Sequence, residues 1–392
     1  MRYEQRIISI LNGLDQETRE SIGMDTIVIE AGALSKAASY IAKHFSSVMI
    51  VVDDNTYRVA GKQLEQLLAE QQVDRVNTVF ITPNHVGDVV ADEQSLMELI
   101  LAVKQHPPDV LVAVGSGTIH DITRMVGYTL ELPFISIPTA PSVDGFNSKG
   151  APIILRGEKK TIVSIGPNAV FADLHILKSA PRELIAAGFG DILGKYTSLF
   201  DWTFGRITNE EPYMEQAYII TKQALNRCVG AVELIEQGEE QGIASLMSGL
   251  IESGIAMLIF GKSHPASGAE HHVSHYWEMD FIKKGKRQLL HGAKVGVSCT
   301  MIAELYHQLS AEDFGLQPDV RESVRNHWQV IKRGINDIPT ANELRALLAK
   351  VGGPATIEQL GIAKELAEQA LREAHRVRPE RYTLLHAYNT AR

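Results

Sequence analysis

Short, largely apolar runs, of which 48–52 is apolar throughout, alternate with longer amphipathic stretches along the first 180 residues of the chain. The apolar runs fit strands that are covered on both faces, as in parallel sheets, and the longer stretches have the period of helices. The expected strands are 26–29, 48–52, 76–81, 109–114, 134–137 and 170–173, and the expected helices are about 34–44, 57–70, 92–105 and one ending near 128. This alternation predicts a doubly wound, Rossmann-like α/β domain over residues 1–180.

Two further patterns complete the expected fold. Apolar residues at 151–155 and 161–165 flank the polar stretch 156–160, which predicts a β-hairpin. From Pro181 onward helical periodicity dominates, with expected helices at roughly 182–206, 212–236, 239–261, 268–283 and 289–310 and shorter ones after 317. We therefore expect an all-α second domain over residues 181–392. Its last segment, 317–392, is expected to be peripheral and to carry no site chemistry.

Composition and charge narrow the class of protein. The chain has 392 residues, of which 45% are hydrophobic and 22% charged, and its net charge is −9. The acidic balance argues against nucleic acid as a main partner, because phosphate backbones need basic surface. No signal peptide and no apolar run long enough to span a bilayer are expected. Cys228 and Cys299 are expected to be buried free thiols, so the predicted location is the cytoplasm.

The densest group of reactive side chains lies at 263–278, where three histidines and two glutamates follow a Pro- and Gly-containing entry. In a helix, His271 and His275 lie on one face because they are four residues apart, whereas His272 is rotated by about 100°. A lone histidine on a helix is more often a hydrogen-bonded core or surface residue than a ligand. Three histidines within five residues make a metal site a stronger hypothesis, although the spacing does not show which of them bind.

Two residues outside this stretch extend the hypothesis of a metal site. His291 stands at the expected start of the next helix, and Asp191, in Ala-Gly-Phe-Gly-Asp, is the best carboxylate candidate elsewhere in the chain. Two imidazoles and one carboxylate with an open coordination position are typical of a catalytic divalent-metal site.

A second candidate site lies at the ends of the expected strands. Gly115-Ser116-Gly117-Thr118-Ile119 joins a strand to a helix, and such a turn lets backbone N–H groups approach a phosphate. Ligands bind at the carboxyl edge of open α/β sheets, where the hydroxyl-rich stretch 138–150 and Asp53 are also expected. For Asp53, hydrogen bonding to a ribose and a helix N-cap are both open.

These motifs together resemble the sn-glycerol-1-phosphate dehydrogenase family, in its bacterial branch, within the iron-containing alcohol dehydrogenase and dehydroquinate synthase-like superfamily. The resemblance rests on Thr-Ala-Pro-Ser-x-Asp-Gly at 139–145, Ala-Gly-Phe-Gly-Asp at 187–191 and Pro-Ala-Ser-Gly-Ala-Glu-His at 265–271, and it covers nearly the whole chain. It implies a dehydroquinate synthase-like fold and the NAD(P)H-dependent reduction of dihydroxyacetone phosphate to sn-glycerol 1-phosphate. It also suggests a homodimer.

The resemblance assigns roles to individual residues. It implies that Asp191, His271 and His291 hold one divalent metal ion, nickel or zinc, with Asp191 also near the substrate, and that Asp144 and His275 are catalytic and contact the substrate. The resemblance implies a structural role for His272. The implied dinucleotide-binding residues are Asp53, Gly115, Ser116, Gly117, Thr118, Ile119, Thr139, Ala140, Pro141, Ser142 and Ser148.

Several alternatives remain at this point. Lys149, Lys195, Lys262 and His264 are all candidates for binding a substrate phosphate, and His264 stands where relatives often have an arginine. Within the same superfamily the competing activities are those of glycerol dehydrogenase and dehydroquinate synthase. The alternative from a different class of protein is a non-catalytic metal- or nucleotide-binding regulator that kept the fold.

Overall fold

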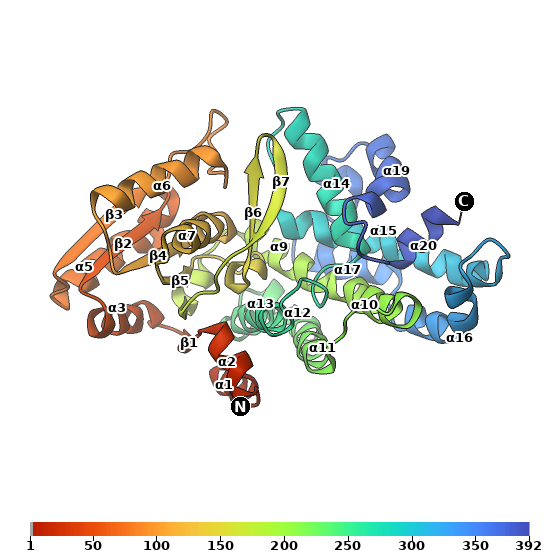
Figure 1. Cartoon of the computed structure of the whole chain (residues 1–392), viewed down its shortest axis with the longest axis horizontal. Coiled ribbons are helices and arrows are strands. Elements are labelled where there is room, and N and C mark those ends of the chain that lie inside the picture. The colour runs from red at the N-terminus through yellow and green to blue at the C-terminus, as the bar shows by residue number, and fades with distance from the viewer. Residues whose placement is uncertain (1–2, 392) are drawn as a thin grey trace.

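A six-stranded parallel sheet forms the core of the first half of the molecule (Figure 1). The computed structural model describes residues 3–391. The strand order is β1-β8-β5-β4-β2-β3, with β1 at Thr26–Glu30, β2 at Ser47–Val52, β3 at Arg75–Phe80, β4 at Val110–Gly115, β5 at Phe134–Pro138 and β8 at Ala169–Asp173. The predicted fold class, a doubly wound α/β part followed by a helical part, is confirmed.

Helices cover both faces of this sheet, which explains the continuous apolar runs. Alternate residues of β2 point to opposite faces, so that Val48 and Ile50 belong to one core cluster and Met49 and Val51 to another. The first cluster packs under α3 (Ala33–His44) and α5 (Lys62–Glu70), the second under α6 (Glu93–Gln105) and α7 (Gly117–Leu130). Shorter elements of this half are α1 (Tyr3–Asn12), α2 (Gln16–Ile22), α4 (Asp54–Thr56), η1 (Tyr57–Gly61), η2 (Gly145–Asn147) and α8 (Leu174–Lys178).

The predicted hairpin exists, but the expected loop and second strand are misplaced. Strand β6 spans Gly150–Leu155 and β7 spans Glu158–Val163, so only Arg156 and Gly157 form the turn. Both have positive φ angles, 53° and 75°, as a tight hairpin turn requires. Because the strand begins at Glu158, Lys159 is part of the hairpin, which stands between the sheet and α14 (Ala269–Lys283) in Figure 1.

The second half of the described chain contains helices and no strand. Its remaining elements are α9 (Arg182–Leu193), α10 (Lys195–Asn209), α11 (Glu215–Gly230), α12 (Val232–Glu236), α13 (Glu240–Phe260), α15 (His291–Ala311), η3 (Phe314–Leu316), α16 (Glu322–Asn336), α17 (Ala341–Lys350), α18 (Ile357–Leu360), α19 (Lys364–Glu373), η4 (Ala374–Arg376) and α20 (Leu384–Thr390). The single helices expected over 182–206 and 212–236 are therefore each two helices, divided at Gly194 and Ala231.

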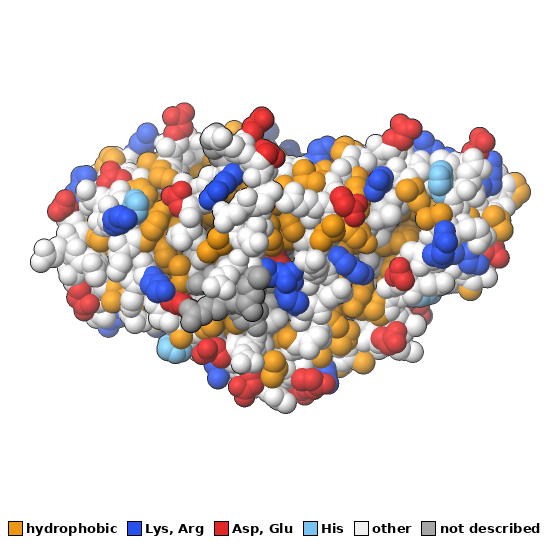
Figure 2. Space-filling view, turned by 90° about the horizontal axis from the view of Figure 1, so that it is seen from below, with side chains coloured by type: hydrophobic (Ala, Val, Ile, Leu, Met, Phe, Trp, Pro, Cys, Tyr) orange, Lys and Arg blue, Asp and Glu red, His pale blue; other side chains and the backbone are white. Residues whose placement is uncertain are grey.

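Helix α13 is long and apolar enough to cross a membrane by length and composition alone, although Ser245, Ser248, Glu252 and Ser253 interrupt its apolar residues. It has 21 residues and a mean hydropathy of 1.8 over its most apolar window, of which 89% is buried inside the molecule. Helices α9, α11 and α12 pack against it. Its apolar surface is thus covered by neighbouring helices, as expected for the central helix of a core. On the outside, Lys and Arg side chains are interspersed with Asp and Glu on the face shown in Figure 2.

Helix α9 crosses both α15 and the loop after β5 at very short range, and glycines make this possible. A Cβ atom on Gly188 would lie 1.8 Å from the carbonyl oxygen of Pro141, and one on Gly292 would lie 1.9 Å from that of Ala187. Neither position tolerates a side chain without movement of the backbone. The close crossing brings Asp191, one turn along α9, next to the start of α15.

Candidate functional site

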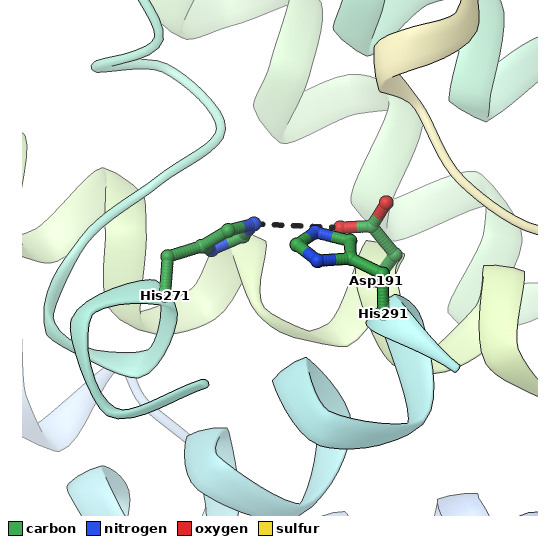
Figure 3. Close-up of side chains that lie close together, drawn as sticks. All are labelled: Asp191, His271 and His291. Atoms are coloured by element: carbon green, nitrogen blue, oxygen red, sulfur yellow. Dashed lines mark ion pairs between the residues drawn. The ribbon is translucent and has the colours of Figure 1, made fainter. Parts of the chain in front are cut away.

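Asp191, His271 and His291 converge from three different helices (Figure 3). Asp191 lies near the end of α9, His271 in the first turn of α14, and His291 is the first residue of α15. One ligand atom of each residue lies within 4.8 Å of those of the other two, and Nε2 of His271 is 3.8 Å from Oδ1 of Asp191. Asp191 is fully buried, and His291 is half-buried. The donor set of two imidazoles and one carboxylate fits a divalent metal ion.

A buried carboxylate fixes the orientation of His271. Its Nδ1 lies 2.7 Å from Oε1 of Glu270, which also accepts a hydrogen bond from the backbone N–H of Gly268. The other carboxylate oxygen of Glu270 accepts from the Thr197 hydroxyl at 2.6 Å. With the Nδ1 proton donated to Glu270, the lone pair on Nε2 faces Asp191. A histidine ligand whose second nitrogen is held by a carboxylate is the usual arrangement in metal sites.

Lys195 compensates the charge of two buried carboxylates beside these residues. Its Nζ lies 2.8 Å from Oδ2 of Asp144 and 3.0 Å from Oδ1 of Asp191, and it donates a third hydrogen bond to the carbonyl oxygen of Ala266. Burial opposes the charge of Lys195, but the two carboxylates raise its pKa. Burial and the nearby Asp191 carboxylate raise the pKa of Asp144.

The same region joins the candidate metal ligands to the loop after β5. The backbone N–H of Asp144 donates to Oδ2 of Asp191 at 2.9 Å, and Ser253 donates to Oδ2 of Asp144 at 2.7 Å. In the described part of the chain, no hydrogen bond reaches Oδ1 of Asp144. That oxygen is the one left for a ligand.

His275 and His272 occupy different surroundings. The His275 ring lies 6.2 Å from that of His271 and 5.9 Å from that of His291, measured between centroids. Its Nδ1 is 3.2 Å from Oε2 of Glu278. His272 points elsewhere: it is fully buried, neither ring nitrogen has a hydrogen-bond partner, and burial keeps its pKa far below the ordinary value. A neutral, packed His272 agrees with the structural role expected of it.

Sequence reasoning missed a cluster of charges beside His275, which we call the Glu278 cluster: Lys159, His275, Glu278 and Lys294. Lys159 on β7 and Lys294 on α15 lie 2.8 and 3.3 Å from Oε2 of Glu278. Helical spacing could have placed Glu278 beside His275 and Lys294 beside His291, because the members of each pair are three residues apart. Nothing in the sequence pointed to Lys159. Burial, followed by repulsion from Lys159, lowers the pKa of Lys294 to about 8.

The segment 317–392, expected to be peripheral, brings one residue next to the candidate site residues. Arg378 follows η4, and its Nη2 lies 3.4 Å from Nε2 of His275. Its Nη1 donates to the hydroxyls of Ser263 and Ser267, both at 3.0 Å. No spacing rule connects residues 103 positions apart, so only the tertiary structure brings Arg378 to this place.

Of the four candidates for a phosphate donor, none lies free beside the metal residues. Lys195 is fully engaged as described above, and Lys262 is exposed. Lys149 lines a different surface hollow, shared with Tyr128 and Ser164. His264 is buried with its ring edge-on to those of Trp202 and Phe260, where burial lowers its pKa to about 3.

The expected dinucleotide-binding segments meet at the carboxyl edge of the sheet. Gly115 and Pro138 are paired in register on adjacent strands, and the backbone N–H of Thr139 donates to the carbonyl oxygen of Gly115 at 2.9 Å. The stretches 115–119 and 139–142 therefore lie side by side. Ile119 is buried, whereas residues 116–118 are half-buried and present the start of α7.

Asp53 and Ser148 are placed at the same edge by local hydrogen bonds. Asp53 follows β2, which neighbours β4, and its Oδ1 accepts from the backbone N–H groups of Asn55 and Thr56 as an N-cap. Its second oxygen stays outside this capping arrangement. Ser148 donates to the carbonyl oxygen of Gly145 at 3.1 Å.

A buried histidine, His120, supports the glycine turn and predicts sensitivity to acid. Its ring nitrogens contact the Ser116 carbonyl oxygen at 2.8 Å and the Ser136 hydroxyl at 2.7 Å, and burial lowers its pKa from 6.5 to about 3. Between pH 6.5 and pH 3 only the unfolded chain binds a proton at this histidine. The folded state is therefore fully stable in this respect above pH 6.5 and loses stability as the pH falls toward 3. Between pH 7.5 and pH 5, we expect the free energy of unfolding of the His120→Gln variant to fall by about 1–2 kcal/mol less than that of the parent. Urea denaturation at the two pH values measures both changes. Equal losses in variant and parent would contradict this prediction.

Comparison with known proteins agrees with this architecture. A family model described as "Iron-containing alcohol dehydrogenase" matches residues 28–181. The structure is similar to that of an iron-containing alcohol dehydrogenase from Thermococcus thioreducens, with a TM-score of 0.65, 17% identity, and coverage of 94% of this chain and 98% of that one. A probable glycerol dehydrogenase from Sinorhizobium meliloti 1021 gives a TM-score of 0.67 at 16% identity, with 94% and 92% covered. The fold is therefore that of the iron-containing alcohol dehydrogenases.

Curated relatives define the family more closely. A Geobacillus stearothermophilus protein named "Glycerol-1-phosphate dehydrogenase [NAD(P)+]" is 45% identical over 94% of this chain and 93% of its own length. Proteins of the same name from Bacillus subtilis and Pyrococcus furiosus are 44% and 32% identical, covering 91% and 94% of this chain and 89% and 92% of their own lengths. The chain belongs to the glycerol-1-phosphate dehydrogenase family, which confirms the resemblance drawn from its motifs.

Proposed function

We propose that this chain is an NAD(P)H-dependent oxidoreductase that reduces dihydroxyacetone phosphate to sn-glycerol 1-phosphate. The observation that carries the proposal is the convergence of Asp191, His271 and His291 next to the loop after β5, in a chain so similar to curated glycerol-1-phosphate dehydrogenases. The segments that would bind the dinucleotide and the residues that would bind the metal are joined by one hydrogen bond, from the N–H of Asp144 to Asp191. A hydride donor and a polarised ketone can thus be held close together.

The metal and the dinucleotide supply the chemistry that side chains lack. A divalent ion held by Asp191, His271 and His291, with nickel or zinc as the candidates, would polarise the ketone and stabilise negative charge on its oxygen. The nicotinamide would supply the hydride. Glu270 keeps His271 in the tautomer that leaves Nε2 unprotonated, and Lys195 holds the Asp191 and Asp144 carboxylates in place.

The dinucleotide would lie along the carboxyl edge of the sheet. The N-terminal backbone of α7, after Gly115, would receive the pyrophosphate, with Thr139 to Ser142 alongside. Asp53 would hold the adenosine ribose with its second oxygen, and Ser148 would lie toward the nicotinamide. We also propose that the two halves, 1–180 and 181–392, act as separate domains, and that the enzyme is a cytoplasmic homodimer.

His275 is proposed to hold the substrate and to relay a proton, with Asp144 holding a substrate hydroxyl through Oδ1. The pKa of His275 is lowered to about 3, mainly by burial, with the positive charges of Lys159 and Arg378 acting in the same direction and Glu278 against them. At neutral pH the ring is then uncharged, with Nδ1–H donated to Glu278 and Nε2 accepting. His275 therefore acts as an acceptor that positions a water molecule: the water gives its proton to the alkoxide, the hydroxide left behind takes a proton from solvent, and the imidazole need not become imidazolium.

This role predicts the pH dependence of a variant. His275→Asn is expected to lower kcat about a hundredfold, while the dependence of log kcat on pH between 6 and 8 keeps the shape of the parent, because His275 is neutral throughout that range. Steady-state rates of NADH oxidation across this range test it. A parent profile that bends near pH 6.5, with the bend missing in the variant, would show that the imidazolium takes part.

The proposed activity is tested by following NADH and NADPH absorbance with dihydroxyacetone phosphate, dihydroxyacetone and the dehydroquinate synthase substrate. Each is measured before metal removal, after it, and after return of nickel or zinc. We expect turnover of the phosphorylated ketone to depend on metal and to exceed that of dihydroxyacetone. Equal turnover of the two ketones would favour glycerol dehydrogenase, and no turnover with any metal would favour a binding protein.

A further inference from the structure

Arg378 is a cation without a carboxylate partner, next to the site. Among residues 3–391, no carboxylate oxygen lies within ion-pair distance of its guanidinium, although Arg381, three residues on, is paired with Glu211 at 3.2 Å. The side chain is only half-buried. A positive charge that is partly removed from water and lacks a counter-ion is costly unless an anion comes to it.

The surroundings of Arg378 are built from hydrogen-bond donors. Its Nη1 donates to the hydroxyl oxygens of Ser263 and Ser267, and each of those hydroxyls keeps its own proton for another acceptor. A guanidinium has five N–H donors, and the structure shows three contacts from this one, including the one to His275. Two N–H groups and two hydroxyls thus remain for a ligand with several acceptor oxygens.

The position relative to the metal residues matches a short phosphorylated ketone. Arg378 touches His275, and the His275 ring lies 6.2 and 5.9 Å from the rings of His271 and His291. In dihydroxyacetone phosphate one carbon and one ester oxygen separate the ketone carbon from phosphorus. When the ketone lies at the metal residues, the phosphate must therefore lie about one side chain away.

We infer that Arg378, together with the hydroxyls of Ser263 and Ser267, binds the phosphate group of the substrate. The inference rests on the proposed reduction of dihydroxyacetone phosphate and names the residues that make that site select a phosphorylated ketone. Guanidinium groups match phosphate oxygens with parallel hydrogen bonds, so Arg378 contributes both charge and orientation.

The lysines of the Glu278 cluster are the competing phosphate site. Lys159 and Lys294 both lie within ion-pair distance of the Glu278 carboxylate, which also accepts from His275. A phosphate bound there would have to approach this carboxylate, and like charges repel. Arg378 offers a positive charge without that repulsion, which is why we assign the phosphate to it.

The test compares the two ketones in the Arg378→Met variant. We expect kcat/KM for dihydroxyacetone phosphate to fall about 10²–10³-fold, mostly through KM, while kcat/KM for dihydroxyacetone falls far less, only through the lost hydrogen bond to His275, so that the preference for the phosphorylated ketone disappears. Arg378→Lys should recover part of the loss, because it restores the charge without the planar donors. Inorganic phosphate should compete with dihydroxyacetone phosphate in the parent and much more weakly in Arg378→Met.

Controls separate the possible outcomes. Arg376→Met removes an exposed arginine of the same segment and should leave both ketones unaffected. Retained turnover of dihydroxyacetone shows that an Arg378 variant is folded. Loss of turnover of both ketones in Arg378→Met and in Arg378→Lys would mean that Arg378 is structural, and would overturn the inference. The inference would also fail if Arg378→Met kept the parental preference for dihydroxyacetone phosphate over dihydroxyacetone while Lys294→Met lost that preference. A parent that does not prefer the phosphorylated ketone would overturn the proposed function, and the inference with it.

Discussion

Replacing His291 by alanine is expected to lower kcat/KM for ketone reduction by at least about a thousandfold without unfolding the protein. His291 supplies one of three ligand atoms that lie within 4.8 Å of one another. Among residues 3–391 its side chain has no hydrogen-bond partner in the protein, so that the substitution breaks no hydrogen bond and removes only ring contacts with His271 and His275. Burial, and then the neighbouring His271, keep its pKa well below the ordinary value, so the ring is neutral, as a metal ligand must be.

The measurement is metal content per chain by elemental analysis, together with NADH kinetics and the thermal midpoint of metal-free protein. We expect the bound metal to fall from about one ion per chain toward zero, at an unchanged midpoint for the metal-free state. His85→Ala, which removes an exposed histidine from the loop before α6, is the control and should keep both metal and activity. A His291→Ala enzyme with full metal content and near-parental turnover would falsify the assignment of this residue as a ligand.

Replacing Lys195 by methionine is expected to cost about 3–5 kcal/mol of unfolding free energy in metal-free protein, because it leaves two buried carboxylates without their shared cation. Lys195 and Asp191 are fully buried, and Asp144 is 5% exposed. Both carboxylates lie within 3.0 Å of the Lys195 amine. Methionine is unbranched and only one heavy atom shorter than lysine, so that lost packing contributes little.

Urea denaturation of the metal-free variants measures this loss. Adding Asp144→Asn to Lys195→Met should restore part of the stability, since only one buried charge then remains unpaired. Added zinc or nickel should stabilise Lys195→Met more than the parent, because the ion supplies positive charge beside Asp191. A loss below about 1 kcal/mol would show that water reaches these carboxylates in the folded state.

Much of the fold could be read from local sequence. The runs at 48–52 and 110–114 are apolar throughout because helices cover both faces of β2 and β4, and this pattern distinguishes a parallel sheet. The predicted hairpin turn was too long because Lys159 and Lys160 look like loop residues. Strand β7 has solvent-exposed positions, where charged side chains are tolerated. The helix expected over 182–206 is interrupted at Gly194, where a Cβ would lie 2.6 Å from Val295 on α15, a contact that no local pattern shows.

The sequence by itself determined the fold class and the identity of the candidate metal ligands, because burial periodicity and short motifs are local properties of a chain. The tertiary structure alone decided how these residues meet, through the glycine-mediated crossing of α9 and α15, and which charges surround them. Lys159 and Arg378 come from a hairpin and from a segment 103 residues beyond His275. Charge pairing acts through space and needs no regular spacing along the chain, so these contacts leave no periodic signal in the sequence.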